Sequence, residues 1–189
     1  MAKNEAVLVP EAAVESSASA VHWGAITGGA LAAVGITIIF IALGPGLGLA
    51  TVSPWSATGT PPASFGFAAG AWLIITQWLS AALGGYLSGR LREKWVGVRT
   101  DEVFFRDTAH GFLSWALATL IVVALLTVGS ALAAAAAAST ASATLTPEAA
   151  ETARKAAMAF SFYSALSLLI GAFIGSAAGA LGGFHRDDT

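Results

Sequence analysis

Three long stretches of this chain contain no Lys, Arg, Asp or Glu, and they constrain its fold more than any other feature. They run from Trp23 to Gly89, from His110 to Pro147 and from Ala156 to His185. A helix that crosses the hydrocarbon core of a bilayer needs about 20 consecutive apolar residues. The first stretch has room for two such helices, separated by the Pro-, Gly- and Ser-containing segment 44–64. We therefore expect four transmembrane helices, at about residues 23–43, 65–87, 111–132 and 158–183.

The composition favours the same class of protein over a soluble bundle. Hydrophobic residues make up 56% of the chain and charged residues 11%, whereas about 25% of the residues in an ordinary soluble domain are charged. A soluble helical bundle would need polar outer faces, which these segments lack. The predicted fold is an all-α membrane protein built from two helical hairpins, and its expected partner is the lipid bilayer.

Other classes of function are excluded by what the chain does not contain. It has no cysteine, so disulfides and thiolate metal sites are ruled out. Its net charge of −2 gives no reason to expect a nucleic-acid partner. We find no nucleophile–base pair, phosphate-binding loop or dinucleotide fingerprint. We therefore expect neither an enzyme nor a bound cofactor.

The distribution of charge predicts domains and orientation. Residues 1–20 are expected to form a disordered tail, 21–185 the transmembrane domain and 186–189 a C-terminal tail. The first tail is acidic at its start, unlike a cleavable signal peptide. Lys and Arg close to the ends of spans favour the cytoplasmic side. The two tails and the loop after the second helix hold seven of the nine Lys and Arg residues, so both termini should lie in the cytoplasm.

The two predicted hairpins resemble each other in sequence. The second helix ends in "ALGGYLSGR" at Arg90, and the fourth ends in "ALGGFHR" at Arg186. The first and third helices both open with a histidine, His22 or His110, close to a tryptophan. A duplicated hairpin, related to its copy by an axis along the membrane normal, explains this pattern. The alternative is that cytoplasmic helix ends commonly combine small residues, an aromatic and a cation.

Glycine recurs at every fourth position of the fourth helix, as in a glycine zipper: Gly171, Gly175, Gly179 and Gly183. Four residues advance a helix by about 400°, so these positions share one slowly rotating face. Helices in lipid associate through close van der Waals contact, which small residues at this spacing permit. Gly24 and Gly28 predict a similar face on the first helix. The groove of the fourth helix is filled either within the chain or by another subunit of a homo-oligomer or larger membrane complex.

Polar residues are scarce inside the predicted spans. None of the four contains an ionisable side chain, which argues against an ion-coupled transporter or a pump. The most polar residue is Gln77, near the middle of the second helix, and Ser161, Ser164 and Ser167 lie on the fourth. These side chains either form hydrogen bonds between helices or line a path for a solute.

The histidines are the weak candidates for a metal site. His22, His110 and His185 all fall at predicted cytoplasmic helix ends, and Asp107 lies one turn before His110. Imidazole and carboxylate groups together can bind zinc. The spacing that places two histidines on one helical face is absent, so we expect no bound metal.

The segments "TDEVFFRDTAHGFLSWALAT", "HWGAITGGA" and "ALGGYLSGR" resemble a group of uncharacterised four-span inner-membrane proteins of proteobacteria. The resemblance covers most of the chain and implies a multi-pass protein of the bacterial inner membrane, with no activity to transfer. Some members carry a label taken from a zinc-ribbon protein of phosphonate operons. That label implies cysteine ligands, which this chain lacks.

Three functions remain open. The first is a non-enzymatic packing or assembly module, or an accessory subunit, suggested by the small-residue faces and the absence of buried charge. The second is a channel or transporter for water or a small solute, formed at the hairpin interface or by an oligomer and lined by Gln77 and the serines. The third is a metal or pH sensor at the cytoplasmic face, formed by the histidines.

Overall fold

The computed structural model describes residues 20–49, 62–94, 97–138 and 146–188. Within these ranges there is no strand. The four helices are α1 (Trp23–Leu49), α2 (Pro62–Leu91), α3 (Thr100–Ala138) and α4 (Pro147–Asp187). Each contains a segment long and apolar enough to cross a bilayer: Trp23–Gly44, Phe67–Leu91, Thr100–Ala136 and Ala150–Asp187. The expectation of an all-helical chain with four candidate spans is confirmed. Nearly all of the predicted N-terminal tail lies outside the described residues.

The helices are longer than the apolar stretches alone predict. α3 begins at Thr100, and two acidic residues in its first turn interact favourably with the positive end of the helix dipole. α4 begins at Pro147, because proline suits the first turn of a helix. It continues to Asp187, so Arg186 belongs to the helix rather than to the predicted C-terminal tail.

α1 also continues beyond its predicted end, to Leu49. A side chain of α2 lies against it here. The indole N–H of Trp72 donates a hydrogen bond to the carbonyl oxygen of Phe40 at 2.9 Å. A Cβ added to Gly44 would lie only 2.7 Å from the same indole nitrogen. This contact holds the last part of α1 against α2.

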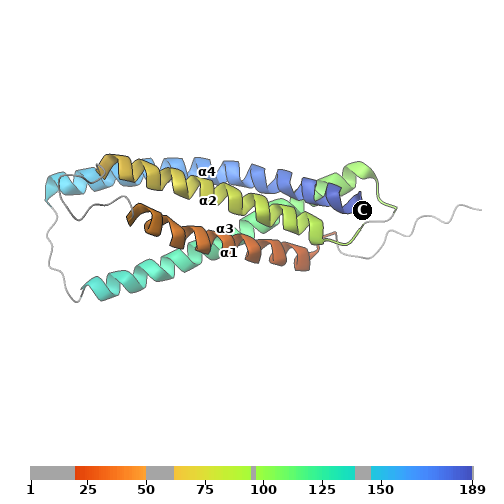
Figure 1. The fold of residues 1–189 in the computed structure, drawn as a ribbon, viewed down its shortest axis with the longest axis horizontal. Helices are drawn as coiled ribbons and strands as arrows, with labels where there is room; N and C mark the ends of the chain where they lie inside the picture. The colour runs from red at the N-terminus through yellow and green to blue at the C-terminus, as the bar shows by residue number, and fades with distance from the viewer. Residues whose placement is uncertain (1–19, 50–61, 95–96, 139–145, 189) are drawn as a thin grey trace, which may run out of the picture.

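The four helices form an elongated bundle (Figure 1). α2 and α4 run side by side in the same direction, and α1 and α3 run the opposite way. α2 contacts all three other helices, whereas the described residues of α1 and α4 do not touch each other. α3 diverges from α2 and α4 toward its C-terminal end (Figure 1). The bundle is therefore closed at one end and splayed at the other.

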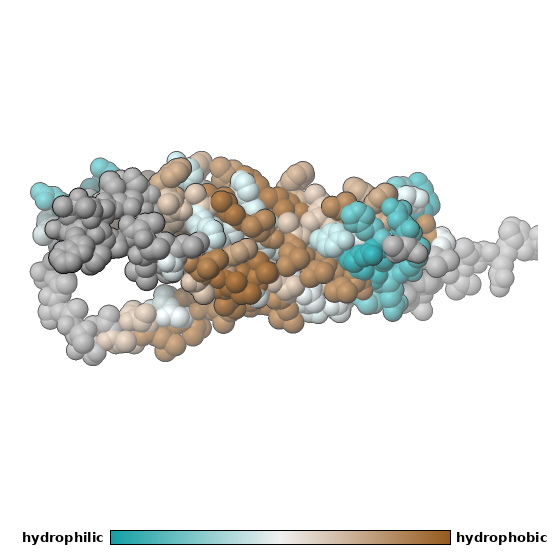
Figure 2. All heavy atoms as spheres, in the orientation of Figure 1, coloured by the Kyte–Doolittle hydropathy of each residue, from teal (hydrophilic) through white to brown (hydrophobic). Residues whose placement is uncertain are grey.

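The surface of the bundle is that of a protein in lipid. Figure 2 shows hydrophobic side chains over the middle of the molecule and hydrophilic ones gathered at the end where α4 terminates. Outward-facing Leu31, Leu120 and Phe173 are 64%, 68% and 74% exposed. Continuous apolar surface of this extent is unfavourable in water. The four spans therefore imply contact with the lipid bilayer.

Candidate functional site

Backbone contacts between glycines hold α2, α3 and α4 together at the closed end. A Cβ added to Gly85 or Gly89 of α2 would overlap the backbone of α4 at Gly175 and Gly179, respectively. A Cβ added to Gly111 of α3 would overlap the backbone of Gly175 and come within 2.9 Å of Gly179. Two helices of the same chain thus fill this part of the α4 groove.

These contacts do not follow the sequence repeat. Gly85 belongs to the first "ALGG" motif, and its counterpart in the second motif is Gly183. Gly85 instead packs on Gly175, two helical turns earlier in α4. The two similar motifs therefore lie at different levels of the bundle.

The outer members of the glycine repeat face side chains rather than backbone. A Cβ on Gly171 would lie 3.0 Å from Nε2 of Gln77 and 3.0 Å from Nε1 of Trp115. A Cβ on Gly183 would overlap the carboxylate of Asp107. Gly171 and Gly183 thus leave room for polar groups that come from α2 and α3.

On α1 the close approach falls at a neighbouring residue. A Cβ on Gly24 would have no contact closer than 4.0 Å, and one on Gly28 would meet Leu91 at an ordinary 3.5 Å. A Cβ on Gly29 would overlap the carbonyl oxygen of Gly84 in α2. The structure therefore places the α1–α2 contact at Gly29 rather than at Gly24 and Gly28.

A buried ion cluster centred on Asp107 lies at the same closed end. The carboxylate of Asp107 accepts a hydrogen bond from Nε of Arg92 at 2.7 Å and lies 3.3 Å from Nη1 of Arg186. Arg186 also donates to Asp187 and to the carbonyl oxygen of Gly89. Asp107 and Arg92 are each 2% exposed. The cluster joins the residue after α2 to the first part of α3 and the last turn of α4.

The charges in this cluster depend on one another. Burial lowers the pKa of Arg92, while the hydrogen bond and the negative charge of Asp107 act in the opposite direction. The guanidinium remains protonated because arginine titrates far above neutral pH. Removing water from both charges is costly, and only their attraction and their hydrogen bonds offset that cost. The arrangement is therefore stable only while its partners are all present.

His110 bridges α3 and the start of α1. It is 1% exposed, and its Nε2 accepts a hydrogen bond from the backbone N–H of His22 at 2.8 Å. Its Nδ1 lies 2.6 Å from the carbonyl oxygen of Arg106 and must donate to it. Both bonds exist together only in the neutral ring with the proton on Nδ1. His110 thereby satisfies a backbone donor that the start of α1 leaves free.

The candidate metal ligands are not arranged as a metal site. His22 reaches His110 through its backbone, and His185 lies beside Tyr86, with 3.3 Å between Nδ1 and the phenol oxygen. Asp107 is bound by arginines. No three His, Asp or Glu side chains in the described ranges could hold a metal ion together.

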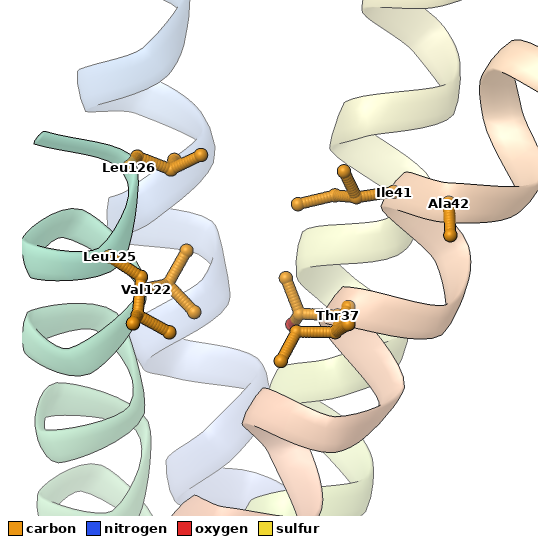
Figure 3. Close-up of a pocket in the computed structure, with 7 residues that line it drawn as sticks. Thr37, Ile41, Ala42, Val122, Leu125 and Leu126 are labelled. Carbon is orange, nitrogen blue, oxygen red and sulfur yellow. The ribbon is translucent and has the colours of Figure 1, made fainter. Parts of the chain in front are cut away.

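A cavity of about 800 Å³ lies between all four helices in the splayed half. Its walls are mainly hydrocarbon, with Phe67, Leu126 and Phe160 among them. A smaller cavity of about 260 Å³ adjoins it, where side chains of α1 and α3 face each other (Figure 3). The residues that line both cavities are Thr37, Ile41, Val122 and Leu126.

The large cavity begins where the glycine repeat of α4 ends. From Gly171 toward the C-terminus, the glycines allow other helices to approach closely. On the other side of Gly171, the α4 residues that line the cavity include Leu168, Tyr163 and Phe160. Ser164 and Ser167 of the same stretch also line it, so the close glycine contacts of α4 end where the bundle opens.

Three of the polar residues predicted inside the spans share this cavity. Gln77, Ser164 and Ser167 line it, whereas Ser161 is exposed and does not. In the described part of the chain the Gln77 side chain makes no hydrogen bond. A primary amide without a protein partner therefore faces the cavity, at a depth where the bilayer supplies no water.

The ion cluster does not follow from the sequence patterns. In those patterns Asp107 is a weak candidate for a metal ligand, and Arg92 and Arg186 are only signals of orientation. One signal of the cluster is present: both "ALGG" motifs are followed by arginines, and an aspartate precedes the second uncharged stretch. The sequence patterns also do not single out Thr37, which donates a hydrogen bond across the α1–α2 interface to Ser80 at 2.9 Å.

The four apolar spans, the lipid-facing surface and the cavity between the helices define a multi-pass integral membrane protein. Comparison with known proteins finds no match among family models, curated proteins or solved structures. The resemblance to four-span inner-membrane proteins stays a prediction.

Proposed function

We propose that this chain is a non-enzymatic, multi-pass protein of the bacterial inner membrane whose bundle binds a small, mainly apolar molecule between its helices. Both termini lie in the cytoplasm in this proposal. The observation that carries it is the cavity of about 800 Å³ with the Gln77 amide in its wall. Ligand sites typically have about 300–1,000 Å³ and apolar walls with a few polar groups.

The closed end favours this function over a pure assembly module. The glycines of α4 would have been the natural seam for another subunit, but Gly175 and Gly179 are covered by α2 and α3. The ion cluster of Asp107, Arg92 and Arg186 lies at the same end. The chain thus keeps one end tightly packed while the other half leaves a space between the helices.

The test is labelling with a long-chain alkyl diazirine in nanodiscs that contain the full chain. We expect saturable labelling of the cavity walls, and unlabelled alkane should compete with it. Gly70 lines the cavity and an added Cβ would meet no atom within 4 Å. Gly70→Phe should therefore fill the space and reduce the saturable labelling about tenfold. Labelling that never saturates, or that Gly70→Phe leaves unchanged, contradicts the proposal.

Gly129→Phe is the matched control. An added Cβ at Gly129 would also meet open space, but Gly129 does not line the cavity. We expect this variant to label like the unchanged chain. An equal loss of labelling in both variants would show that bulk on a helix surface, rather than the filled cavity, causes the effect.

A second candidate is an accessory subunit or homo-oligomer, which the exposure of α3 favours. Every residue from Val123 to Ala136 is exposed. Val123 and Leu126 line the large cavity, but the described helices cover little of this half of α3. A partner helix could lie along it, although lipid could equally cover it. The size and composition of the complex recovered in mild detergent distinguish the two: a lone chain counts against the accessory subunit.

A further inference from the structure

The narrow end of the cavity brings together two nitrogen-bearing side chains from different helices. Gln77 comes from α2 and Trp115 from α3, and both line the cavity. Nε2 of Gln77 and Nε1 of Trp115 each lie 3.0 Å from the position that a Cβ on Gly171 would take. Because residue 171 of α4 is a glycine, it places no side chain between the two groups.

Neither group has its hydrogen bonds satisfied by the described part of the chain. Nε1 of Trp115 is buried and has no partner, and the Gln77 side chain makes no hydrogen bond. An indole N–H can only donate, while a primary amide donates twice and accepts at one oxygen. Even if the Gln77 oxygen accepted the indole N–H, both amide hydrogens would remain without an acceptor. The site therefore has a surplus of donors.

The rest of the lining does not remove this surplus. Ser164, Ser167 and Thr76 also line the cavity, and each hydroxyl has one donor and two acceptor lone pairs. In the described part of the chain, however, none of them accepts a hydrogen bond from Nε1 of Trp115 or from the Gln77 amide. Thr37, Ser80, Thr119 and Tyr163 add further hydroxyl groups, and the remaining walls are hydrocarbon and aromatic. In a bilayer an unsatisfied donor is costly because water is absent. A ligand that supplies an acceptor removes this cost, whereas a purely hydrocarbon ligand does not.

We propose that the cavity takes an amphipathic molecule with a hydrocarbon body and one acceptor-only oxygen, such as a ketone, quinone or ester carbonyl, which Gln77 and Trp115 bind. This inference rests on the proposed function, since it names the ligand class of the same cavity. The carbonyl oxygen accepts from the amide of Gln77 and the indole of Trp115 beside Gly171. The hydrocarbon body extends along the apolar walls toward Phe67 and Phe160.

The experiment compares a long-chain methyl ketone with the alkane of equal length, both radiolabelled, in nanodiscs that contain the full chain. Partitioning into empty nanodiscs is subtracted. We expect the ketone to bind about tenfold more tightly than the alkane, as one or two net hydrogen bonds allow. Equal affinities overturn the inference but leave the proposed function standing. If neither probe binds above empty nanodiscs, the proposed function itself is wrong.

Variants of the two side chains test whether Gln77 and Trp115 cause the preference for the ketone over the alkane. Gln77→Leu and Trp115→Phe should each reduce the ratio of the two affinities from about tenfold to about threefold, and the double variant should abolish the preference, while the alkane still binds. Trp78→Phe is the matched control, because Nε1 of Trp78 is also buried without a partner but does not line the cavity. It should keep the full preference. A full preference that survives in Gln77→Leu, or that is lost in Trp78→Phe, contradicts the assignment.

Discussion

Asp107 is 2% exposed, and its carboxylate is bound by Arg92 and Arg186. It stabilises the folded state only while those partners are present. Replacing Asp107 by Ala leaves Arg92 buried without its counter-charge. We predict that Asp107→Ala lowers the free energy of unfolding by about 3–5 kcal/mol, the loss typical of a broken buried pair. Unfolding by denaturant in detergent measures this loss.

Asp101→Ala is the control for that variant, because Asp101 also pairs with an arginine but its side chain is 69% exposed. Exposed pairs contribute at most about 1 kcal/mol. Similar losses for the two variants would mean that the buried cluster contributes no more than a surface pair.

His110 provides a second prediction at the scale of one residue. Its Nε2 accepts from the His22 backbone N–H only while the ring is neutral. Arg92, Asp107 and His22 are the charged or titratable groups that act on the ring. As the pH falls and His110 takes up a proton, this bond must break and the start of α1 should loosen. The stabilisation is therefore present at high pH and lost at low pH.

Hydrogen exchange at the His22 amide, corrected for its intrinsic rate at each pH, measures this effect. In the unchanged chain, we expect the protection of the His22 amide to decrease as the pH is lowered. Protection should vary less with pH in His110→Gln, whose amide oxygen remains an acceptor when the pH falls. Identical pH profiles in the two proteins would show that His110 does not control the start of α1.

At the scale of helices, the closed end depends on glycines that leave little or no room for a side chain. A side chain at Gly175 would have to displace α2 or α3, since the atoms it meets include the backbone of Gly111 and Ala81. We predict that Gly175→Leu lowers the free energy of unfolding by about 3 kcal/mol or more, the upper range for an overpacked site. Gly35→Leu, where an added Cβ meets open space, should change it by less than about 1 kcal/mol. Equal effects would show that the close glycine contacts do not hold the bundle.

The helices could be predicted from the sequence, but their mutual register could not. The number of spans follows from the length of the uncharged stretches, which is a local property. Asp107 contacts both Arg92 and Arg186 because of the axial positions of α2 and α4 relative to α3, and these positions are not a local property of the sequence. The contacts of Gly85 and Gly111 with Gly175 fix these positions, and they join residues far apart in the chain.

The candidate site, too, could be predicted from the sequence only in part. The composition of the second and fourth predicted helices identified Gln77, Ser164 and Ser167 as polar residues within spans. That these three share a cavity, while Ser161 does not, depends on the rotation of each helix about its axis. Trp115 was noted only as a marker of the repeat, because an indole shows no unmet donor until its surroundings are known.

At the scale of the whole molecule, the proposed orientation turns the closed end of the bundle toward one side of the bilayer and the open half toward the other. The closed end contains most of the positive charge, including Arg92 and Arg186, so it should face the cytoplasm. The cavity then lies in the half toward the outer face. Opening on the cytoplasmic side would require the ion cluster and the glycine contacts to separate together.

This orientation can be tested with introduced cysteines, because the sequence contains no native cysteine. Glu93 lies after α2 and Glu148 in the first turn of α4, and both are exposed. In intact cells, a membrane-impermeant maleimide that enters only the periplasm should label Glu148→Cys and leave Glu93→Cys unlabelled. Glu93→Cys should react once the inner membrane is permeabilised, because the proposed orientation places residue 93 in the cytoplasm. The reverse pattern would place the closed end outside the cell and the cavity in the half toward the cytoplasm. Labelling of both variants in intact cells would rule out a single orientation.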